Sequence, residues 1–562
     1  MKYFIAFVCM TVSISAFAQI KRTEQLTGHS RRYEKTEWNI YLTAAWQNPY
    51  FQEQVALDML LIAPSGKTIK MPCYYESGKS GSESLWKARF APQEQGKYQY
   101  YFQLTQDNKA VSVSKKKSFV VKPSGKDGFL HTDNNWVLRF DDNKPFRGIG
   151  EDIAWESRAH DDSKYFKQLN EDPKYNYEYM LHSLSKHGGN FFRTWICSWN
   201  LPIDWKKGFN SNRYSPSDNY YNPSALRKTD SLVDLCDSLN IYMMLTLGPG
   251  AYGTREGGVA ASAADFFVNP AAITRYKNRL RYIIARWGYS TSIGAWELFN
   301  EVDNVMYANK EHPINAADIV KWHDEMSRYI KATDPYNHIV TTSISHRDLP
   351  GLNDLPAIDI NQKHIYKNTK SIPSTIVEYE HKFHKPYVIG EYGYEWDWSK
   401  NFNDFAGRMD SDFKRGLWYG LFSPTPVLPM SWWWEFFDNR GTDAYIRNVR
   451  IILNQMLAAG KGAFEEERVD VSDAGVTSYS VKCGGTIFIY LYNPDSTAKR
   501  FSVSFKNSFS TLPQLKSFDC EAGKFANAEI KTEADKLVID SVKLLPDSDK
   551  VFIISADSHL KK

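Results

Sequence analysis

Two glutamates stand out in this sequence as groups that could do chemistry together. Glu301 ends the run Trp296-Glu297-Leu298-Phe299-Asn300-Glu301, and Glu391 follows Ile389-Gly390. Two carboxyl groups about 5–5.5 Å apart can cleave a glycosidic bond with retention, one donating a proton and the other attacking the anomeric carbon. The two groups must then differ in pKa, because the acid is protonated and the nucleophile is ionised. The pair therefore predicts acid–base and nucleophilic chemistry on a sugar, provided that the fold brings the two residues together.

Further polar side chains at the ends of apolar runs could support such a pair. Arg193, which ends Asn190-Phe191-Phe192-Arg193, can hold a neighbouring carboxylate ionised by charge and hydrogen bonding. Tyr366 can hydrogen-bond the nucleophile, and Asn300 can hold the sugar 2-hydroxyl, a contact that strengthens in the transition state. Glu297 is expected to pair inside the fold or to orient Arg193.

Tryptophans offer flat apolar faces against which sugar rings can stack. Three of them, Trp432, Trp433 and Trp434, follow one another directly. Neighbours in a strand point to opposite faces, so either Trp433 alone or Trp432 together with Trp434 faces the site. We expect Trp432 to be the platform. The other residues expected to line the cleft are Glu151, Asp152, Trp155, Tyr252 and Arg255, although Asp152 could equally be a structural cap.

These residues fall within a repeating pattern of strands and helices. From Phe146 to about Asp438, short apolar runs alternate with amphipathic helical segments. Such alternation predicts a (β/α)8 barrel, in which loops at the C-terminal ends of the strands build the site. A doubly wound sheet is the alternative, but no G-x-G-x-x-G motif follows the first strand. The expected strands are 146–153, 190–198, 241–247, 294–299, 338–344, 358–364, 387–390 and 427–434, and the clearest helices are 177–187, 222–239, 270–287 and 316–333.

The order of these motifs resembles that of clan A glycoside hydrolases, and most closely family 5. The matching elements are Gly189-x-x-x-Arg193, W-E-L-x-N-E ending at Glu301, His364-x-Tyr366, Gly390-Glu391-Tyr392-Gly393 and a tryptophan on the eighth strand. The resemblance covers the barrel and implies retaining hydrolysis, with Glu301 as acid/base and Glu391 as nucleophile. It also implies site roles for Arg193, Asn300, His364 and Tyr366. Taken by itself, His364 could equally be a core histidine.

Segments on both sides of the barrel show short alternating strands separated by turn signals, which is typical of β-sandwiches. We expect a signal peptide over residues 1–18, an immunoglobulin-like sandwich over 19–123, the barrel over 124–463 and a second sandwich over 464–562. The N-terminal sandwich is similar to the immunoglobulin-like domain, of the DUF5060 type, that often precedes such barrels in bacterial polysaccharide-degrading proteins.

The N-terminus has the pattern of a secretory signal peptide. Lys2 precedes an apolar run from Tyr3 to Ala16, and the small-residue motif Ala16-Phe17-Ala18 follows. The run is shorter than the roughly 20 apolar residues that a membrane-spanning helix needs, and no other stretch is apolar enough for one. We therefore expect a secreted or periplasmic protein with no membrane span.

Composition narrows the choice of partners. The formal net charge is only +4 over 562 residues, without a long Lys/Arg run, which argues against a nucleic-acid partner. The sequence contains neither H-E-x-x-H nor C-x-x-C, so we expect no metal and no cofactor. Cys483 and Cys520 lie in the same C-terminal segment and could pair in an oxidising compartment.

Together these features predict a secreted retaining glycoside hydrolase that acts on a plant, algal or microbial polysaccharide or its oligosaccharides. The alternative is a surface glycan-binding protein that keeps the barrel but lacks catalysis. The presence of both carboxylates argues against it, because a binder does not need the matched pair. The sequence does not name the sugar, because this fold handles many sugars with similar catalytic residues.

Overall fold

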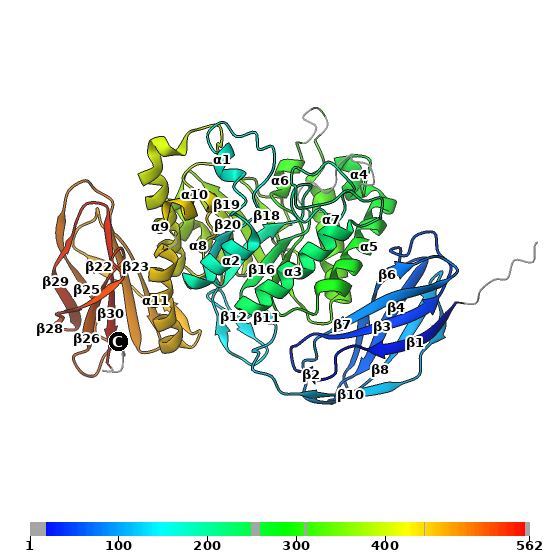
Figure 1. The fold of residues 1–562 in the computed structure, drawn as a ribbon. Helices are drawn as coiled ribbons and strands as arrows, with labels where there is room; N and C mark the ends of the chain where they lie inside the picture. The colour runs from blue at the N-terminus through cyan, green and yellow to red at the C-terminus, as the bar shows by residue number, and fades with distance from the viewer. Residues whose placement is uncertain (1–17, 249–258, 308–310, 312, 443, 557–562) are drawn as a thin grey trace, which may run out of the picture. The chain divides into compact units, whose positions relative to one another are not determined.

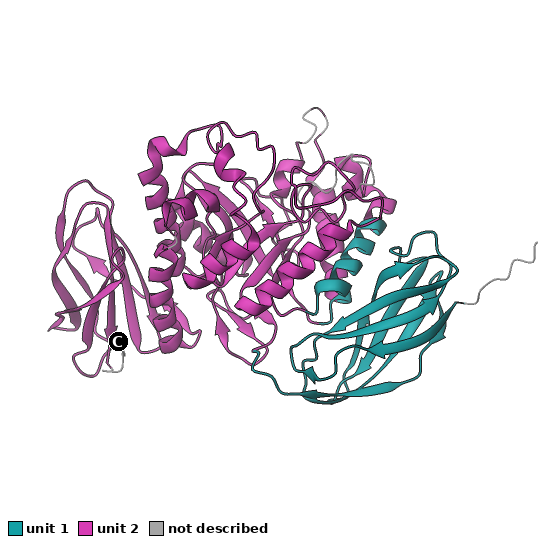
Figure 2. Cartoon of the chain, viewed as in Figure 1, with its two compact units in different colours: residues 1–126, 274–289, 332–335 teal, residues 127–273, 290–331, 336–562 magenta. Residues whose placement is uncertain are grey.

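The computed structural model describes residues 18–248, 259–307, 311, 313–442 and 444–556 (Figure 1). The predicted signal peptide, except Ala18, and both Tyr252 and Arg255 lie outside the described residues. The chain forms two compact units, one of residues 1–126, 274–289 and 332–335 and the other of the remaining residues from 127 onward (Figure 2). A β-sandwich, a barrel and a second β-sandwich follow one another along the chain, which confirms the predicted fold class.

The first unit contains an N-terminal sandwich of two sheets that are antiparallel except for one short pair of strands. Burial alternates along β3 (Thr36–Thr43), where Trp38, Ile40 and Leu42 are fully buried and the residues between them are partly exposed. Such alternation is expected of a strand with one face on a core.

The strands of this sandwich form two sheets. The first sheet has the strand order β1 (Gln19–Gln25), β3, β7 (Glu83–Phe90) and β6 (Tyr74–Gly78). The second sheet has the strand order β2 (Ser30–Arg31), β10 (Lys117–Lys122), β8 (Gly96–Gln106), β4 (Val55–Ile62) and β5 (Thr68–Pro72), with β9 (Lys109–Val113) beside β8. The short parallel pair is β2 with β10.

The barrel is built on seven parallel strands in sequence order, with helices between them in the chain. The strands are β14 (Gly150–Asp152), β15 (Phe191–Trp195), β16 (Tyr242–Thr246), β17 (Ile293–Glu297), β18 (Ile339–Ile344), β19 (Ile360–Tyr366) and β20 (Tyr387–Gly393). The main intervening helices are α2 (Tyr177–Lys186), α3 (Pro223–Leu239), α5 (Pro270–Trp287), α7 (Ala316–Thr333), α8 (Ile372–Phe383) and α9 (Ala406–Leu421). The helices predicted at 177–187, 222–239, 270–287 and 316–333 are thus confirmed to within a residue.

The eighth side of the barrel is closed by an irregular segment instead of the regular strand predicted at 427–434. Val427 bridges Gly148, and Ser431 bridges both Glu151 and Tyr392, which joins the first and seventh strands. At Trp433 the backbone turns left-handed (φ 73°), and α10 (Trp434–Arg440) begins immediately afterwards. The predicted strand was therefore wrong: isolated bridges at Val427 and Ser431 close the barrel, and the reversal at Trp433 stops the alternation of side chains.

A small sheet closes the opposite, N-terminal end of the barrel. It consists of β11 (Leu130–Thr132), β12 (Leu138–Phe140) and β13 (Pro145–Phe146), below the barrel in Figure 1. Its apolar side chains pack against inward-facing residues at the starts of the barrel strands. This floor cluster comprises Leu130, Leu138, Phe140, Phe146, Phe191, Met244, Ala295, Ile339, Ile360, Val388, Val427 and Met430. The strand predicted at 146–153 is accordingly two strands, of which only Gly150–Asp152 belongs to the barrel.

The C-terminal sandwich also has two sheets, and its core combines the inner faces of both. One sheet contains β21 (Phe464–Glu466), β23 (Thr477–Cys483), β24 (Thr486–Asn493), β30 (Ser548–Ser555), β26 (Gln514–Asp519) and β27 (Lys524–Ala528), and the other β22 (Asp470–Val471), β25 (Lys499–Lys506), β29 (Lys536–Leu544) and β28 (Lys531–Glu533). The remaining helices are α1 (Lys167–Asn170), α4 (Ala263–Val268), α6 (Val302–Val305) and α11 (Ala444–Gly460). Cys483 and Cys520 are buried free thiols, so the pairing considered from the sequence is not formed.

A buried charge cluster joins this sandwich to the barrel helix α9. Asp549 of β30 accepts hydrogen bonds from Arg415 and from Tyr490, and Lys414 lies 3.0 Å from its other oxygen. Asp549→Asn would remove the buried counter-charge of Lys414 and Arg415, whose other carboxylate partners, Glu521 and Asp547, are exposed, so we expect a loss of about 3 kcal/mol in the free energy of unfolding. Urea denaturation measures this loss. The matched control is Asp540→Asn in the half-exposed Lys531 pair, which should cost less than about 1 kcal/mol; equal losses for the two variants would contradict the expectation.

Within the described residues, none of the helices has the length and apolarity required to cross a lipid bilayer.

Candidate active site

Arg193 is the centre of the polar layer that lies above the apolar floor of the barrel. Its side chain is fully buried on β15 and forms a two-pronged pair with Glu297, at 2.6 Å from Nε and 2.9 Å from Nη2. Thr246 and Gln362 also donate hydrogen bonds to Glu297, at 2.6 and 2.8 Å. This arrangement satisfies the carboxylate completely and fixes the plane of the guanidinium. Glu297 therefore orients Arg193, one of the two roles expected of it.

The other edge of the guanidinium faces the two predicted catalytic strand ends. Arg193 Nη1 donates to Glu391 Oε1 at 2.7 Å, and Nη2 donates to Asn300 Oδ1 at 2.6 Å. The second oxygen of Glu391 accepts a 2.6 Å hydrogen bond from the Tyr366 hydroxyl. Both donors favour the ionised carboxylate. Glu391 thus has the surroundings of a group that is held as an anion.

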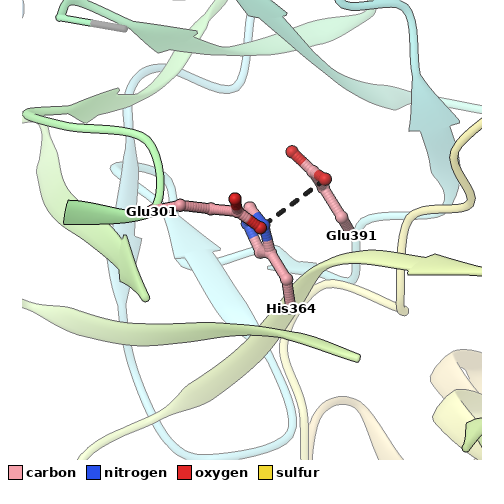
Figure 3. Close-up of side chains that lie close together, drawn as sticks. All are labelled: Glu301, His364 and Glu391. Atoms are coloured by element: carbon pink, nitrogen blue, oxygen red, sulfur yellow. Dashed lines mark hydrogen bonds and ion pairs between the residues drawn. The ribbon is translucent and has the colours of Figure 1, made fainter. Parts of the chain in front are cut away.

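Glu301 lies across from Glu391, with His364 between them (Figure 3). His364 Nδ1 is 2.9 Å from a Glu301 oxygen and 3.4 Å from a Glu391 oxygen. One oxygen of each carboxylate and a His364 ring nitrogen all lie within 4.8 Å of one another. The second oxygen of Glu301 accepts from Asn304 at 2.9 Å. Folding therefore brings together the two carboxyl groups that are 90 residues apart in the chain.

Two carboxylates and a histidine are also ligand types that divalent metals accept. Here Arg193 already supplies a positive charge 2.7 Å from Glu391. A metal ion at this trio would be repelled by that fixed cation. The trio is better suited to acid–base chemistry than to metal binding.

The backbone at Glu301 is unusual for a residue with a side chain. Its φ of 46° lies in the left-handed region, directly before α6. Such a conformation costs about 1–2 kcal/mol in a residue other than glycine and is frequent at functional sites. Its amide donates to the Ser343 hydroxyl at 2.9 Å, which helps to hold the turn. The turn places the Glu301 carboxyl beside His364.

The titration of the two carboxyls differs because their exposure and partners differ. Burial raises the pKa of Glu391 above its ordinary value, and the neighbouring charge of Glu301 adds to that rise against the opposing effects of His364 and Arg193. Burial also raises the pKa of Glu301, but the hydrogen bond and charge of His364 outweigh it, so the pKa is lowered. The Glu301 side chain is 24% exposed, whereas that of Glu391 is 5% exposed. A sugar ring over Glu301 would remove water from it and raise its pKa.

At the end of β14 the structure selects Asp152, not Glu151, as the residue beside Arg193. Asp152 pairs in register with Arg193, and its Oδ1 is 3.2 Å from Arg193 Nη1. Burial, together with the charges of Glu391 and Glu297, raises the pKa of Asp152. Successive side chains in a strand point to opposite faces. Glu151 therefore points away from the site, and its prediction as a sugar contact was wrong by one residue.

An indole cluster forms one wall beside the site. Trp432 contacts Trp155, Trp195 and Trp434 with ring centroids 5.2–5.4 Å apart. Trp195 in turn has the Arg193 guanidinium over its ring, at 5.5 Å. Trp434 is only 3% exposed, so it supports the other rings from behind and offers no face to a sugar, contrary to expectation. Of the rings in this cluster, Trp155 and Trp432 border a pocket.

The sequence argument missed several members of this site. Thr246, Gln362 and Asn304 carry no motif, and only the strand register and the turn after Glu301 reveal them. Asp152 had been considered only as a cleft or capping residue. The register of β14 against β15 pairs Asp152 with Arg193, and this register could not be read from the sequence.

Comparison with known proteins agrees with this geometry. Residues 157–405 match the family model described as Cellulase (glycosyl hydrolase family 5), and residues 29–105 match a domain of unknown function, DUF5060. Mannan endo-1,4-beta-mannosidase A of Podospora anserina is 26% identical over 207 residues, covering 31% of this chain and 52% of its own. The enzyme of the same name from Aspergillus aculeatus is 34% identical over 124 residues, covering 21% and 30%. This chain thus spans about half or less of the length of these relatives.

Solved structures show the same architecture. A candidate glycoside hydrolase of Bacteroides vulgatus superposes with a TM-score of 0.64 at 15% identity, covering 94% of this chain and 100% of that one. At that identity the likeness concerns the fold alone. Together with the family match, it shows that the central part of the chain is a clan A glycoside hydrolase barrel. Within that clan the barrel is of the family 5 type, preceded by a DUF5060 domain.

Proposed function

We propose that this protein is a retaining glycoside hydrolase with Glu391 as nucleophile and Glu301 as acid/base. The observation that carries the proposal is the facing pair of carboxylates, with oxygens within 4.8 Å of each other at the ends of β17 and β20. Retaining enzymes place their carboxyl groups about 5–5.5 Å apart, whereas inverting enzymes need about 6.5–9.5 Å to admit a water. The spacing here supports double displacement.

The contacts of each carboxylate support its role. Arg193 and Tyr366 donate to Glu391 and keep an attacking oxygen anionic, whereas the more exposed Glu301 can carry a proton once a sugar covers it. In the first step a Glu391 oxygen bonds to the anomeric carbon, the glycosidic bond breaks, and Glu301 protonates the leaving oxygen. In the second step Glu301 takes a proton from water, the water oxygen bonds to the anomeric carbon, and the ester to Glu391 breaks.

For substrate, we propose β-1,4-linked mannan or its oligosaccharides as the first choice among plant, algal and microbial polysaccharides. The support is that two fungal relatives with which the barrel shares sequence are mannan endo-1,4-beta-mannosidases. A secreted or periplasmic location is proposed from the predicted signal peptide over residues 1–18. A glycan-binding protein without catalysis is the alternative. Glycan binding alone does not explain why two carboxylates lie so close together or why the backbone at Glu301 is strained.

The test is sugar release from mannan, glucomannan, cellulose and xylan, with the anomeric configuration of fresh product followed by NMR. We expect release from at least one β-linked substrate, with the β-anomer formed first and then mutarotating. An α-anomer as first product would contradict double displacement. Tight binding of a polysaccharide without release, in protein shown to be folded, would favour the glycan-binding alternative.

A further inference from the structure

A pocket of about 280 Å³ adjoins the indole cluster but is not lined by Glu301 or Glu391. Its walls come from three segments, which are the loop after β14, the loop after β20 and the start of α10. The size is near the lower end of the roughly 300–1,000 Å³ range of small-molecule sites, enough for a sugar ring. Its lining includes the tryptophans Trp155, Trp432, Trp396 and Trp398 and the charged or acidic residues Arg158, Asp162 and Glu435.

Two tryptophans of this pocket are exposed on the surface. Trp396 is 55% exposed and Trp398 is 46% exposed. Large apolar side chains that stay exposed beside a pocket mark binding sites more often than chance placement. Indole faces suit the apolar faces of sugar rings, which need flat partners and few hydrogen bonds there.

The loop that carries these tryptophans is firmly anchored. Glu395 accepts hydrogen bonds from the backbone amides of Trp396 and Asp397, at 3.0 and 3.1 Å, and pairs with Lys367 at 2.9 Å and with Lys400. The Glu395 carbonyl also accepts from the Trp433 indole at 2.6 Å. Because the platforms are held before a ligand arrives, little ordering entropy would oppose binding.

Packed aromatic side chains link the wall of the pocket to the catalytic site. Trp432 and Trp155 line it, and both contact Trp195, which carries the Arg193 guanidinium over its ring. The Trp432 amide also donates to the Tyr392 carbonyl at 3.0 Å, next to Glu391 in the chain. The indole cluster therefore reaches from the Arg193 side of the catalytic site to the wall of the pocket.

The polar groups of the pocket suit an uncharged ligand. Arg158 is paired with the buried Asp161, so its charge is compensated, and the other lining charges are carboxyls, those of Asp162 and Glu435. Glu435 is 6% exposed, and burial raises its pKa to about 8. At neutral pH it is then a carboxylic acid that can donate to a sugar hydroxyl. No excess positive charge attracts a uronate or a sulfated sugar.

We propose that this pocket is a second saccharide subsite, in which Trp396 and Trp398 stack a ring of the same uncharged β-linked chain whose bond lies between Glu301 and Glu391. Glu435 is a specificity-determining residue that donates a hydrogen bond there. The position of the cleaved bond along that chain rests on the proposed function, whereas binding in the pocket does not.

The experiment is titration calorimetry with mannohexaose and cellohexaose on the full chain carrying Glu391→Gln, which prevents turnover. We expect Trp396→Ala/Trp398→Ala in that background to raise Kd at least about tenfold, because stacked tryptophans are typical binding hot spots. Phe525→Ala, an equally exposed aromatic on the C-terminal sandwich, is the matched control and should leave Kd within twofold. Glu435→Gln keeps a neutral donor and should bind nearly as tightly as Glu435, whereas Glu435→Ala should bind several-fold more weakly.

Each outcome bears on the pocket separately from catalysis. An unchanged Kd in the double tryptophan variant overturns the subsite, and so does failure of both hexaoses to bind the Glu391→Gln protein. Sugar release by the wild-type chain decides the catalytic proposal independently. In an active protein, kcat/KM for the hexaose should fall at least about tenfold in the double variant, with little change for an aryl monoglycoside that is too short to reach the pocket.

Discussion

Replacing Glu391 by alanine is expected to lower kcat at least about 10³-fold, because the covalent route loses its nucleophile while the rest of the site stays in place. Azide should restore part of the rate. In Glu391→Ala it fills the space of the lost carboxylate and attacks the anomeric carbon directly, which gives a glycosyl azide of inverted configuration. In Glu301→Ala, azide instead attacks the glycosyl ester on Glu391 and gives a retained product. NMR of the azide anomers separates the two results.

This pair of variants tests the roles and not only the importance of the carboxylates. Exchanged azide anomers would show that Glu301 is the nucleophile and Glu391 the acid/base, as the pKa directions of the two groups alone would suggest. Glu178→Ala, on the exposed surface of α2, serves as the control and should keep full activity. Full activity in Glu391→Ala would refute the proposed mechanism.

Arg193→Met is expected to produce the largest combined loss of stability and activity. The variant leaves Glu297, Glu391 and Asp152 buried without their common cation, which should lower the free energy of unfolding by about 3–5 kcal/mol. It also removes an influence that lowers the pKa of Glu391, so that pKa should rise further. Because the nucleophile acts as an anion, the acid limb of the kcat/KM profile should move to higher pH.

Arg193→Lys distinguishes charge from geometry. Lysine keeps the positive charge but cannot form the two-pronged pair with Glu297 and still reach Glu391. We expect its unfolding free energy to lie between those of wild type and Arg193→Met, with kcat/KM reduced about 10²-fold. Denaturant unfolding and pH–rate profiles measure the two effects. A methionine variant with an unshifted acid limb would show that Arg193 does not help to ionise Glu391.

The sequence allowed the barrel and the central residues of the site to be predicted because both depend on local patterns. Strand and helix periodicity located seven of the barrel strands and the helices between them. Glu301 follows a strand, Tyr366 ends one, and Arg193 and Glu391 lie near the C-terminal ends of theirs; parallel strands bring such ends to one face. The order of the strands along the chain was therefore enough to predict that these four residues meet.

The errors arose where one residue decides the direction of a side chain. Glu151 and Asp152 are neighbours in the first barrel strand and point to opposite faces, and the sequence alone did not show which of the two faces Arg193. Trp434 was assigned to the site by alternation, but the segment before it is irregular, and the left-handed residue Trp433 leads directly into a helix. The tryptophans at 396 and 398 lie in a loop, for which no periodicity gives a direction.

The apolar floor formed by β11–β13 has a consequence for the order of events during turnover. With the lower end of the barrel filled by side chains, sugar and water share one entrance at the upper face. Glu391 is nearly enclosed, so the water that breaks its ester must arrive on the Glu301 side, through the space that the leaving sugar has occupied. In the proposed mechanism the first product therefore has to depart before hydrolysis can begin, and a second sugar that enters first would receive the glycosyl group in place of water. Because the closed barrel leaves water and sugar to enter by the same route, the balance between hydrolysis and transglycosylation depends on which of the two reaches the glycosyl ester first.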